Sequence, residues 1–320
     1  MRVTVLAGGV GAARFLRGLI QVVPPSDVTA VVNTGDDTVL HGLSISPDLD
    51  TVTYTLAEAI DPERGWGLAG ETWAAMSALE RLASVRPSGS SAAPTWFNLG
   101  DRDLATHLYR TARLDEGASL TAVTAEIARA WELSTTILPM TDGSLRTMIT
   151  LADSGDEVSF QDYFVRLRHA RPVASIRFDH AAMPTTSVIE AIEGADAVVV
   201  APSNPLVSIG PIRALPGIDE ALSGRRESVV AVSPIVGGAA LKGPAARMLT
   251  ELGREASVVG VARLYAPIAG TLVVDPVDDD LAPAVEAEGQ RCVVAPSIMS
   301  DLERSAALAR TTIDTIAPWR

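Results

Sequence analysis

Several sequence features are rare or absent in this chain, and each of these absences excludes a class of protein. Its one cysteine, Cys292, cannot form an intramolecular disulfide and lies in an apolar stretch that predicts a buried strand. No apolar run approaches the ~18 residues needed to cross a bilayer, and the first residues lack the apolar core and cleavage site of a secretory signal. We therefore expect no membrane partner and a cytoplasmic location.

Positive charge is also scarce, because 26 Lys and Arg residues oppose 39 Asp and Glu residues and leave a net charge of −13. Nucleic-acid affinity depends on cationic contacts to phosphates, so we expect no nucleic-acid partner. Lysine is represented only by Lys242, and arginine cannot act as a Schiff-base residue or a tunable general base. Any phosphate ligand must be held by local donors or by a metal ion.

The strand pattern of the 320 residues indicates an α/β protein. A strand at residues 2–6 is followed by a glycine loop and by helical apolar spacing, which is the first half of a βαβ unit. Several further strands are continuous apolar runs, as in parallel sheets that helices cover on both faces. These strands are predicted at residues 28–33, 147–151, 175–178, 197–201, 228–232, 258–261, 271–274 and 292–295.

Residues 51–133 contain little strand signal and predict helices instead, at 52–59, 71–85, 104–115 and 120–130. The proline-bounded segment 86–94 predicts an exposed loop without a function of its own. Later helices are predicted at 188–192, 244–252 and 301–316. We predict a Rossmann-like, mostly parallel sheet formed by residues 1–50 and 134–320, with 51–133 as a mostly helical insertion.

The glycine loop after the first strand is the first candidate ligand site. Gly8, Gly9 and Gly11 permit a close approach of backbone N–H groups and a helix N-terminus to a phosphate. The loop lacks the third glycine of the full dinucleotide fingerprint. A tight strand-to-helix turn without a ligand therefore stays open as an alternative.

The loop after the second strand concentrates four aspartates, Asp36, Asp37, Asp48 and Asp50. A solvated turn is the ordinary explanation of such a cluster. Here the loop lies beside the glycine turn, at the edge of the sheet where ligands bind. Mg²⁺ takes one or two carboxylates together with phosphate oxygens, so two of these aspartates would suffice.

Polar residues gather in three further segments. Asp101 or Asp103 could cap the helix that follows. Asp101 and His107 lie in a polar cluster at the start of this helix, although His107 could equally be a surface residue. Two late loops each follow an apolar strand and contain Ser203, Asn204, Ser233 and Lys242. These side chains could hold the phosphates and base of a nucleotide, although ordinary strand-to-helix connections explain either loop singly.

Taken together, these stretches resemble the CofD family, the 2-phospho-L-lactate transferases, called FbiA in actinobacteria. The matching stretches run in family order across most of the chain. They are Gly8–Phe15, Val32–Asp37, Ser46–Thr51, Arg64–Gly67, Gly100–His107, Pro202–Pro211 and Ser233–Ile235.

The resemblance implies that a guanosine-diphospho-activated three-carbon acid is attacked by the ribityl hydroxyl of the deazaflavin Fo, with release of GMP. Phosphoryl transfer of this kind depends on positioning and charge neutralisation. By resemblance, Asp36 and Asp50 would bind Mg²⁺ and the Fo side, and Asp50 would also accept the proton of the hydroxyl. Asn98 falls at an Fo-contacting position that is a lysine in some relatives.

The same resemblance places the guanosine diphosphate portion, GDP or GMP, on Gly8–Gly11, Ser203, Asn204 and Ser233. It also places His107 near the site.

Two other functions are possible. YvcK-like proteins share the scaffold and resemble nucleotide-sugar-binding regulators, but the stretches 46–50 and 100–107 fit the transferase pattern. An NAD-dependent dehydrogenase would need the third glycine and would meet repulsion from the aspartates.

The sequence leaves the donor acid open among phosphoenolpyruvate, 2-phospho-L-lactate and 3-phosphoglycerate. The arginine bias and the likeness to FbiA favour phosphoenolpyruvate. We also expect a homodimer, the commonest closed oligomer.

Overall fold

The structure, a computed structural model, describes residues 1–179, 182–241 and 243–316. Its centre is a seven-stranded sheet with the order β5-β2-β1-β9-β10-β13-β14, and every neighbouring pair is parallel. This is the strand order of a Rossmann sheet with one strand added, so the predicted fold class is confirmed. The strands are β1 Val3–Ala7, β2 Val28–Val32, β5 Thr136–Pro139, β9 Ala197–Val200, β10 Val229–Val232, β13 Thr271–Val274 and β14 Arg291–Val294.

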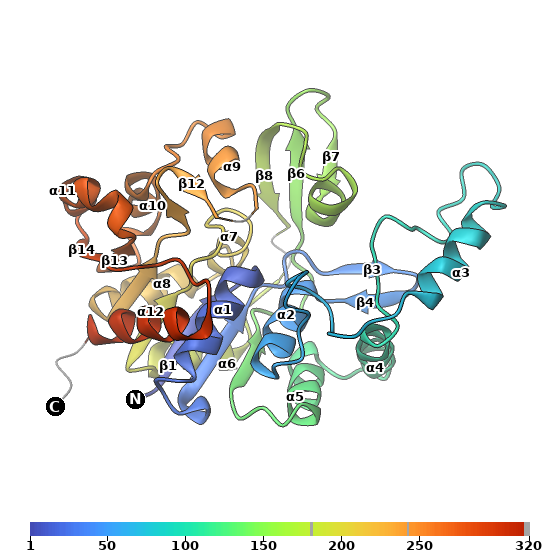
Figure 1. Cartoon of the computed structure of the whole chain (residues 1–320), viewed down its shortest axis with the longest axis horizontal. Coiled ribbons are helices and arrows are strands. Elements are labelled where there is room, and N and C mark those ends of the chain that lie inside the picture. The colour runs from blue at the N-terminus through green and yellow to red at the C-terminus, as the bar shows by residue number, and fades with distance from the viewer. Residues whose placement is uncertain (180–181, 242, 317–320) are drawn as a thin grey trace.

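Helices cover both faces of this sheet (Figure 1). Val3 and Val5 of β1 pack into the core on one face, whereas Leu6 packs into the core on the other, because successive strand residues point to opposite faces. Contributors to the first core include α1 Gly9–Leu19, α2 Pro47–Leu56, α5 Leu120–Ala130 and α12 Leu302–Asp314. Those on the other face include α6 Thr186–Gly194, α7 Gly210–Arg213, α8 Ile218–Ser223, α9 Ala245–Glu251, α10 Val258–Tyr265 and α11 Ala282–Ala287.

Two groups of elements extend from the central sheet (Figure 1). The first contains the hairpin of β3 Thr38–Leu40 and β4 Leu43–Ile45, together with α3 Ala74–Ala83 and α4 Asp103–Asp115. The second is an antiparallel sheet, with the order β7-β6-β8, made of β6 Thr147–Leu151, β7 Glu157–Ser159 and β8 Val173–Phe178. The strands predicted at 147–151 and 175–178 therefore exist but lie outside the parallel sheet. A short hairpin joins β11 Ile235–Val236 to β12 Ala239–Ala240.

Helices α3 and α4 cap each other. Asp101, just before α4, accepts hydrogen bonds from the backbone amides of Ala74 and Ala75 at the start of α3, at 2.8 and 3.0 Å. Glu71, just before α3, accepts hydrogen bonds from the amides of Arg102 and Asp103 at 2.7 and 2.9 Å. The expectation that Asp101 or Asp103 caps the following helix is wrong, because the capping carboxylates are exchanged between the two helices.

One predicted strand is a helix, and one predicted helix begins earlier in the chain. Val258–Val261 is not a strand but the first turn of α10, because the Ser257 side chain accepts hydrogen bonds from the amides of Val259 and Gly260 and starts a helix there. Helix α2 begins at Pro47 rather than at residue 52, with Asp48 and Asp50 in its first turn. Proline at the first position and acidic residues in the first turn both favour a helix start. The described residues contain no helix that is long and apolar enough to span a membrane.

Candidate active site

A cavity of about 870 Å³ lies at the carboxyl edge of the parallel sheet, at the point between β1 and β9 where the strand order reverses. Open α/β sheets bind their ligands at this position. Most residues predicted for the site line the cavity: Gly8, Gly9, Gly11, Asp36, Asp50, Asn98, His107, Ser203, Asn204 and Ser233. Asp101 is outside its lining and caps α3, and Lys242 lies outside the described residues.

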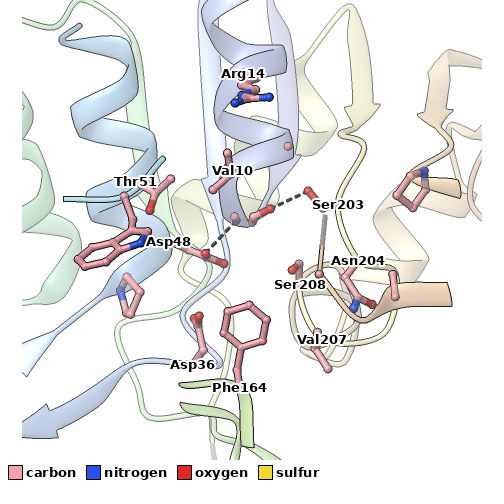
Figure 2. Close-up of a pocket in the computed structure, with 18 of the residues that line it drawn as sticks. Val10, Arg14, Asp36, Asp48, Thr51, Phe164, Ser203, Asn204, Val207 and Ser208 are labelled. Atoms are coloured by element: carbon pink, nitrogen blue, oxygen red, sulfur yellow. Dashed lines mark hydrogen bonds between the residues drawn. The ribbon is translucent and has the colours of Figure 1, made fainter. Parts of the chain in front are cut away.

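The glycine turn is held by side chains from both sides (Figure 2). Asp48 of α2 accepts a hydrogen bond from the amide of Gly9 at 2.8 Å, and Ser203 donates one to the carbonyl of Gly8 at 2.8 Å. A Cβ atom on Gly11 would lie 2.4 Å from the carbonyl oxygen of Pro202. Gly11 therefore allows α1 to pack against the loop after β9, and the Gly9 amide already has a carboxylate partner.

Two buried carboxylates converge on one amide group. Nδ2 of Asn33 donates to Asp36 at 3.1 Å and to Asp48 at 2.9 Å, while its Oδ1 accepts from the amide of Gly35. Burial, with repulsion from Asp48 and Asp37, raises the pKa of Asp36 well above its usual value. Burial raises the pKa of Asp48 to about 6, despite the hydrogen bonds from Asn33 and Gly9. Among the described residues neither carboxylate forms an ion pair, so their negative charge is uncompensated.

Gln161 contacts the same cluster from the helical segment that joins β7 to β8. Its Nε2 donates to the carbonyl oxygen of Asp36 at 3.2 Å and to the carboxylate of Asp36 at 3.3 Å. The side chain is buried, and Phe160 and Phe164 beside it line the cavity. The connection between β7 and β8 thus holds Asp36 in place and supplies an aromatic wall.

Asp50 has a different environment. Nη1 of Arg110, on α4, donates to Oδ2 of Asp50 at 3.1 Å, and Nη2 donates to Oδ1. Arg110 is only 2% exposed. Nδ1 of His107 lies 3.7 Å from Oδ2 of Asp50. The charge of Asp50 is therefore balanced by an arginine, unlike that of Asp36 or Asp48.

The same face of α4 carries Asp103, which forms a second network with His107 and Tyr54. Nε2 of His107 lies 3.4 Å from Oδ2 of Asp103, and the hydroxyl of Tyr54 donates to Oδ1 at 2.5 Å. Burial alone would raise the pKa of Asp103, but the interaction with the nearby His107 and the hydrogen bond from Tyr54 outweigh it and lower the pKa. The buried Tyr54 hydroxyl has a strongly raised pKa, because burial and the nearby carboxylates oppose its ionisation.

These carboxylates can accommodate a metal ion in two arrangements. Ligand atoms of Asp50, Asp103 and His107 lie within 4.8 Å of one another and could together hold an ion. Asp36 and Asp48 offer oxygen donors whose charge no side chain balances, and a hard cation such as Mg²⁺ prefers oxygen donors. The residues present therefore fit a divalent metal.

The remaining walls come from loops and aromatic side chains. The hydroxyl of Ser233 accepts a hydrogen bond from the amide of Ile235, and Oδ1 of Asn204 accepts one from the amide of Leu206, so both side chains shape their own loops. Asn98 is exposed and follows Trp96 and Phe97 at the cavity. The cavity thus combines acidic groups at its base with apolar rings on its walls.

Four residues of this site were not chosen from the sequence: Arg110, Gln161, Tyr54 and Asp103. Spacing could have revealed Arg110, because Asp103, His107 and Arg110 are at i, i+4 and i+7 and lie on one helical face. Tyr54 is likewise four residues after Asp50 on α2. Gln161 gives no such signal, since its partner is 125 residues away in the sequence.

Fold and site together define a Rossmann-like α/β protein with an acidic ligand cavity at the switch point of its sheet. The family model of the 2-phospho-L-lactate transferase CofD matches residues 3–312. Two similar curated relatives are both named phosphoenolpyruvate transferase. That of Streptomyces griseus is 43% identical over 98% of either chain, and that of Kitasatospora aureofaciens is 44% identical over 98% of this chain and 97% of its own.

The chain belongs to the CofD family, and it is an enzyme, a transferase of coenzyme F-420 biosynthesis. The resemblance predicted from the sequence is confirmed. Among solved structures, protein BH3568 of Bacillus halodurans matches with a TM-score of 0.63 over 98% of this chain and 99% of its own. It is 18% identical, so this likeness shows the fold alone.

Proposed function

We propose that the enzyme transfers a phosphoenolpyruvyl or 2-phospholactyl group from its guanosine-diphospho-activated form to the ribityl hydroxyl of Fo, releasing GMP. The observation that carries the proposal is the meeting of Asp36, Asp48 and Asp50 in one cavity at the switch point of the sheet. The names of the relatives favour phosphoenolpyruvate as the donor acid. A cavity of about 870 Å³ has room for a large ligand.

Within this function, Asp36 and Asp50 remain the proposed metal residues. Asp48 would assist Asp36, with which it shares Asn33, whereas Asp103 and His107 would assist Asp50, because their ligand atoms lie within 4.8 Å of one another. Bound Mg²⁺ would neutralise charge on the transferred phosphate. Asp50 would accept the proton of the attacking hydroxyl, while Arg110 fixes the orientation of its carboxylate. The insertion residues 51–133 would supply the Fo side of the cavity, through Trp66, Phe97 and Asn98.

The test is a titration of the purified protein with Fo, with and without Mg²⁺, followed by the fluorescence of the deazaflavin. Turnover is then measured with each of the three candidate donors. Saturable binding of Fo and release of GMP are expected, with the highest turnover for the phosphoenolpyruvate donor. Binding of a nucleotide sugar without binding of Fo would refute the transfer to Fo and favour a regulator.

A further inference from the structure

The glycine turn does not offer all of its amides to a phosphate, because the amide of Gly9 already has a partner. The amide of Gly9 donates to Asp48, and the carboxylates of Asp36, Asp48, Asp50 and Asp103 all line the cavity. A diphosphate placed there would meet repulsion chiefly from Asp36 and Asp48, whose charge no ion pair among the described residues balances. A cationic side chain that faces the cavity would offset this repulsion, in addition to any metal.

Two arginines line the cavity, Arg14 and Arg64, and they differ in what they already bind. Nη2 of Arg64 lies 2.9 Å from Asp61 and donates to the carbonyl of Leu68, and its guanidinium lies over two tryptophan rings. Among the described residues the Arg14 side chain makes one hydrogen bond, a long one of 3.5 Å from Nη1 to the carbonyl of Met299. Within the described part of the chain Arg14 forms no ion pair.

The position of Arg14 is suitable for a phosphate at the switch point. It lies on α1, four residues after the cavity-lining Val10 and therefore on the same helical face (Figure 2). Guanidinium has five N–H donors in a planar fork that matches phosphate oxygens. In Arg14 only one of the five has a hydrogen-bond partner within the part of the chain that the structure describes. Helix α1 follows β1, where folds of this type hold the diphosphate of a nucleotide.

We propose that Arg14 binds the diphosphate of the guanosine-diphospho donor, in place of the glycine-loop amide that Asp48 occupies. This inference rests on the proposed function for the identity of the donor, but the anion site itself does not depend on Fo. Arg17 is a matched control on the same helix: it is paired with Glu58 at 3.1 Å on the surface and is outside the cavity lining.

The experiment measures binding of GDP, inorganic pyrophosphate and Fo by calorimetry to the wild-type protein and to Arg14→Met, Arg14→Lys, Arg64→Met and Arg17→Met. We expect Arg14→Met to weaken GDP and pyrophosphate binding about ten-fold or more, which is typical of a lost charge-assisted hydrogen bond. Fo binding should change by less than about two-fold. Arg14→Lys should retain part of the affinity, because it keeps the charge but loses the fork. Arg64→Met and Arg17→Met should bind pyrophosphate like the wild type.

Three results would overturn the assignment. They are unchanged GDP and pyrophosphate binding by Arg14→Met, an equal loss of Fo binding in that variant, and no binding of either anion by the wild type. Thermal unfolding of each variant shows whether it is folded, and a folded Arg14→Lys keeps the test valid if Arg14→Met unfolds. A wild type that binds pyrophosphate through Arg14 but does not bind Fo would refute the proposed function and leave the anion site intact.

Discussion

The guanidinium of Arg110, on helix α4, holds both carboxylate oxygens of Asp50, on helix α2. Both residues are buried: Arg110 is 2% exposed and Asp50 is 5% exposed. Loss of one partner of a buried pair leaves an uncompensated charge and typically costs about 3–5 kcal/mol, whereas loss of both charges costs much less. The pair therefore allows stability and catalysis to be separated by mutation.

We predict that Arg110→Met lowers the free energy of unfolding by about 3 kcal/mol and reduces turnover strongly. The double variant Arg110→Met/Asp50→Asn should regain most of the stability but not the turnover. Urea denaturation and a GMP-release assay measure the two quantities. Arg113→Met is the matched control, since Arg113 is three residues further along α4 and pairs with Glu126 near the surface. Recovery of turnover in the double variant would show that the carboxylate of Asp50 is dispensable.

Gln161 is expected to act on turnover by positioning Asp36. Gln161→Ala removes both hydrogen bonds to Asp36, and Gln161→Glu places a further carboxylate against it. We expect turnover to fall about ten-fold in the first variant and further in the second, with a higher Mg²⁺ concentration needed for half-maximal rate. Gln290→Ala is the control, because Gln290 is also buried and donates to the carbonyl of Ala269 at 3.0 Å, outside the cavity lining. Equal losses in the alanine variants would indicate a general effect on stability.

Much of the scaffold was predictable, because the strands of the parallel sheet are continuous apolar runs between glycine and proline signals. Val258–Val261 was predicted wrongly as a strand, because a continuous apolar run shows neither the helical nor the strand periodicity of hydrophobic residues. Only the helix cap at Ser257 distinguishes helix from strand there. The edge strand β5 gave no separate signal before the structure paired it with β2.

The position of a residue at the cavity was predictable where one loop or one turn carries it, as for Asp36 and the glycine turn. It was not predictable where the partner comes from a distant segment. Asp48 lies at the Gly9 amide and Gln161 at Asp36 only because α2 and the connection between β7 and β8 pack against the carboxyl edge. Sequence spacing within one element cannot show such contacts between elements.

Gly11 illustrates the difference between a phosphate-binding and a packing glycine. We predict that Gly11→Ala lowers the free energy of unfolding by about 1–3 kcal/mol, because the added Cβ would lie 2.4 Å from the carbonyl oxygen of Pro202. Gly194→Ala should be nearly neutral, since its Cβ would make an ordinary 3.7 Å contact with Arg2. Urea denaturation and GDP binding measure the outcome. A Gly11→Ala protein with wild-type stability but without GDP binding would contradict the packing role.

The raised pKa of Asp48, about 6, predicts how stability depends on pH. Between pH 4 and 6 the folded protein retains a proton that the unfolded chain has released, so this group makes stability fall as pH rises through that window. Asp48→Asn removes the titration. In EDTA, the free energy of unfolding of Asp48→Asn should therefore fall less between pH 4 and pH 7 than that of the wild type. The two decreases should differ by up to about 3 kcal/mol. Asp115→Asn, an exposed substitution of the same kind at the end of α4, should follow the wild type. Parallel curves for the wild type and Asp48→Asn would mean that Asp48 stays ionised in the folded protein across this range.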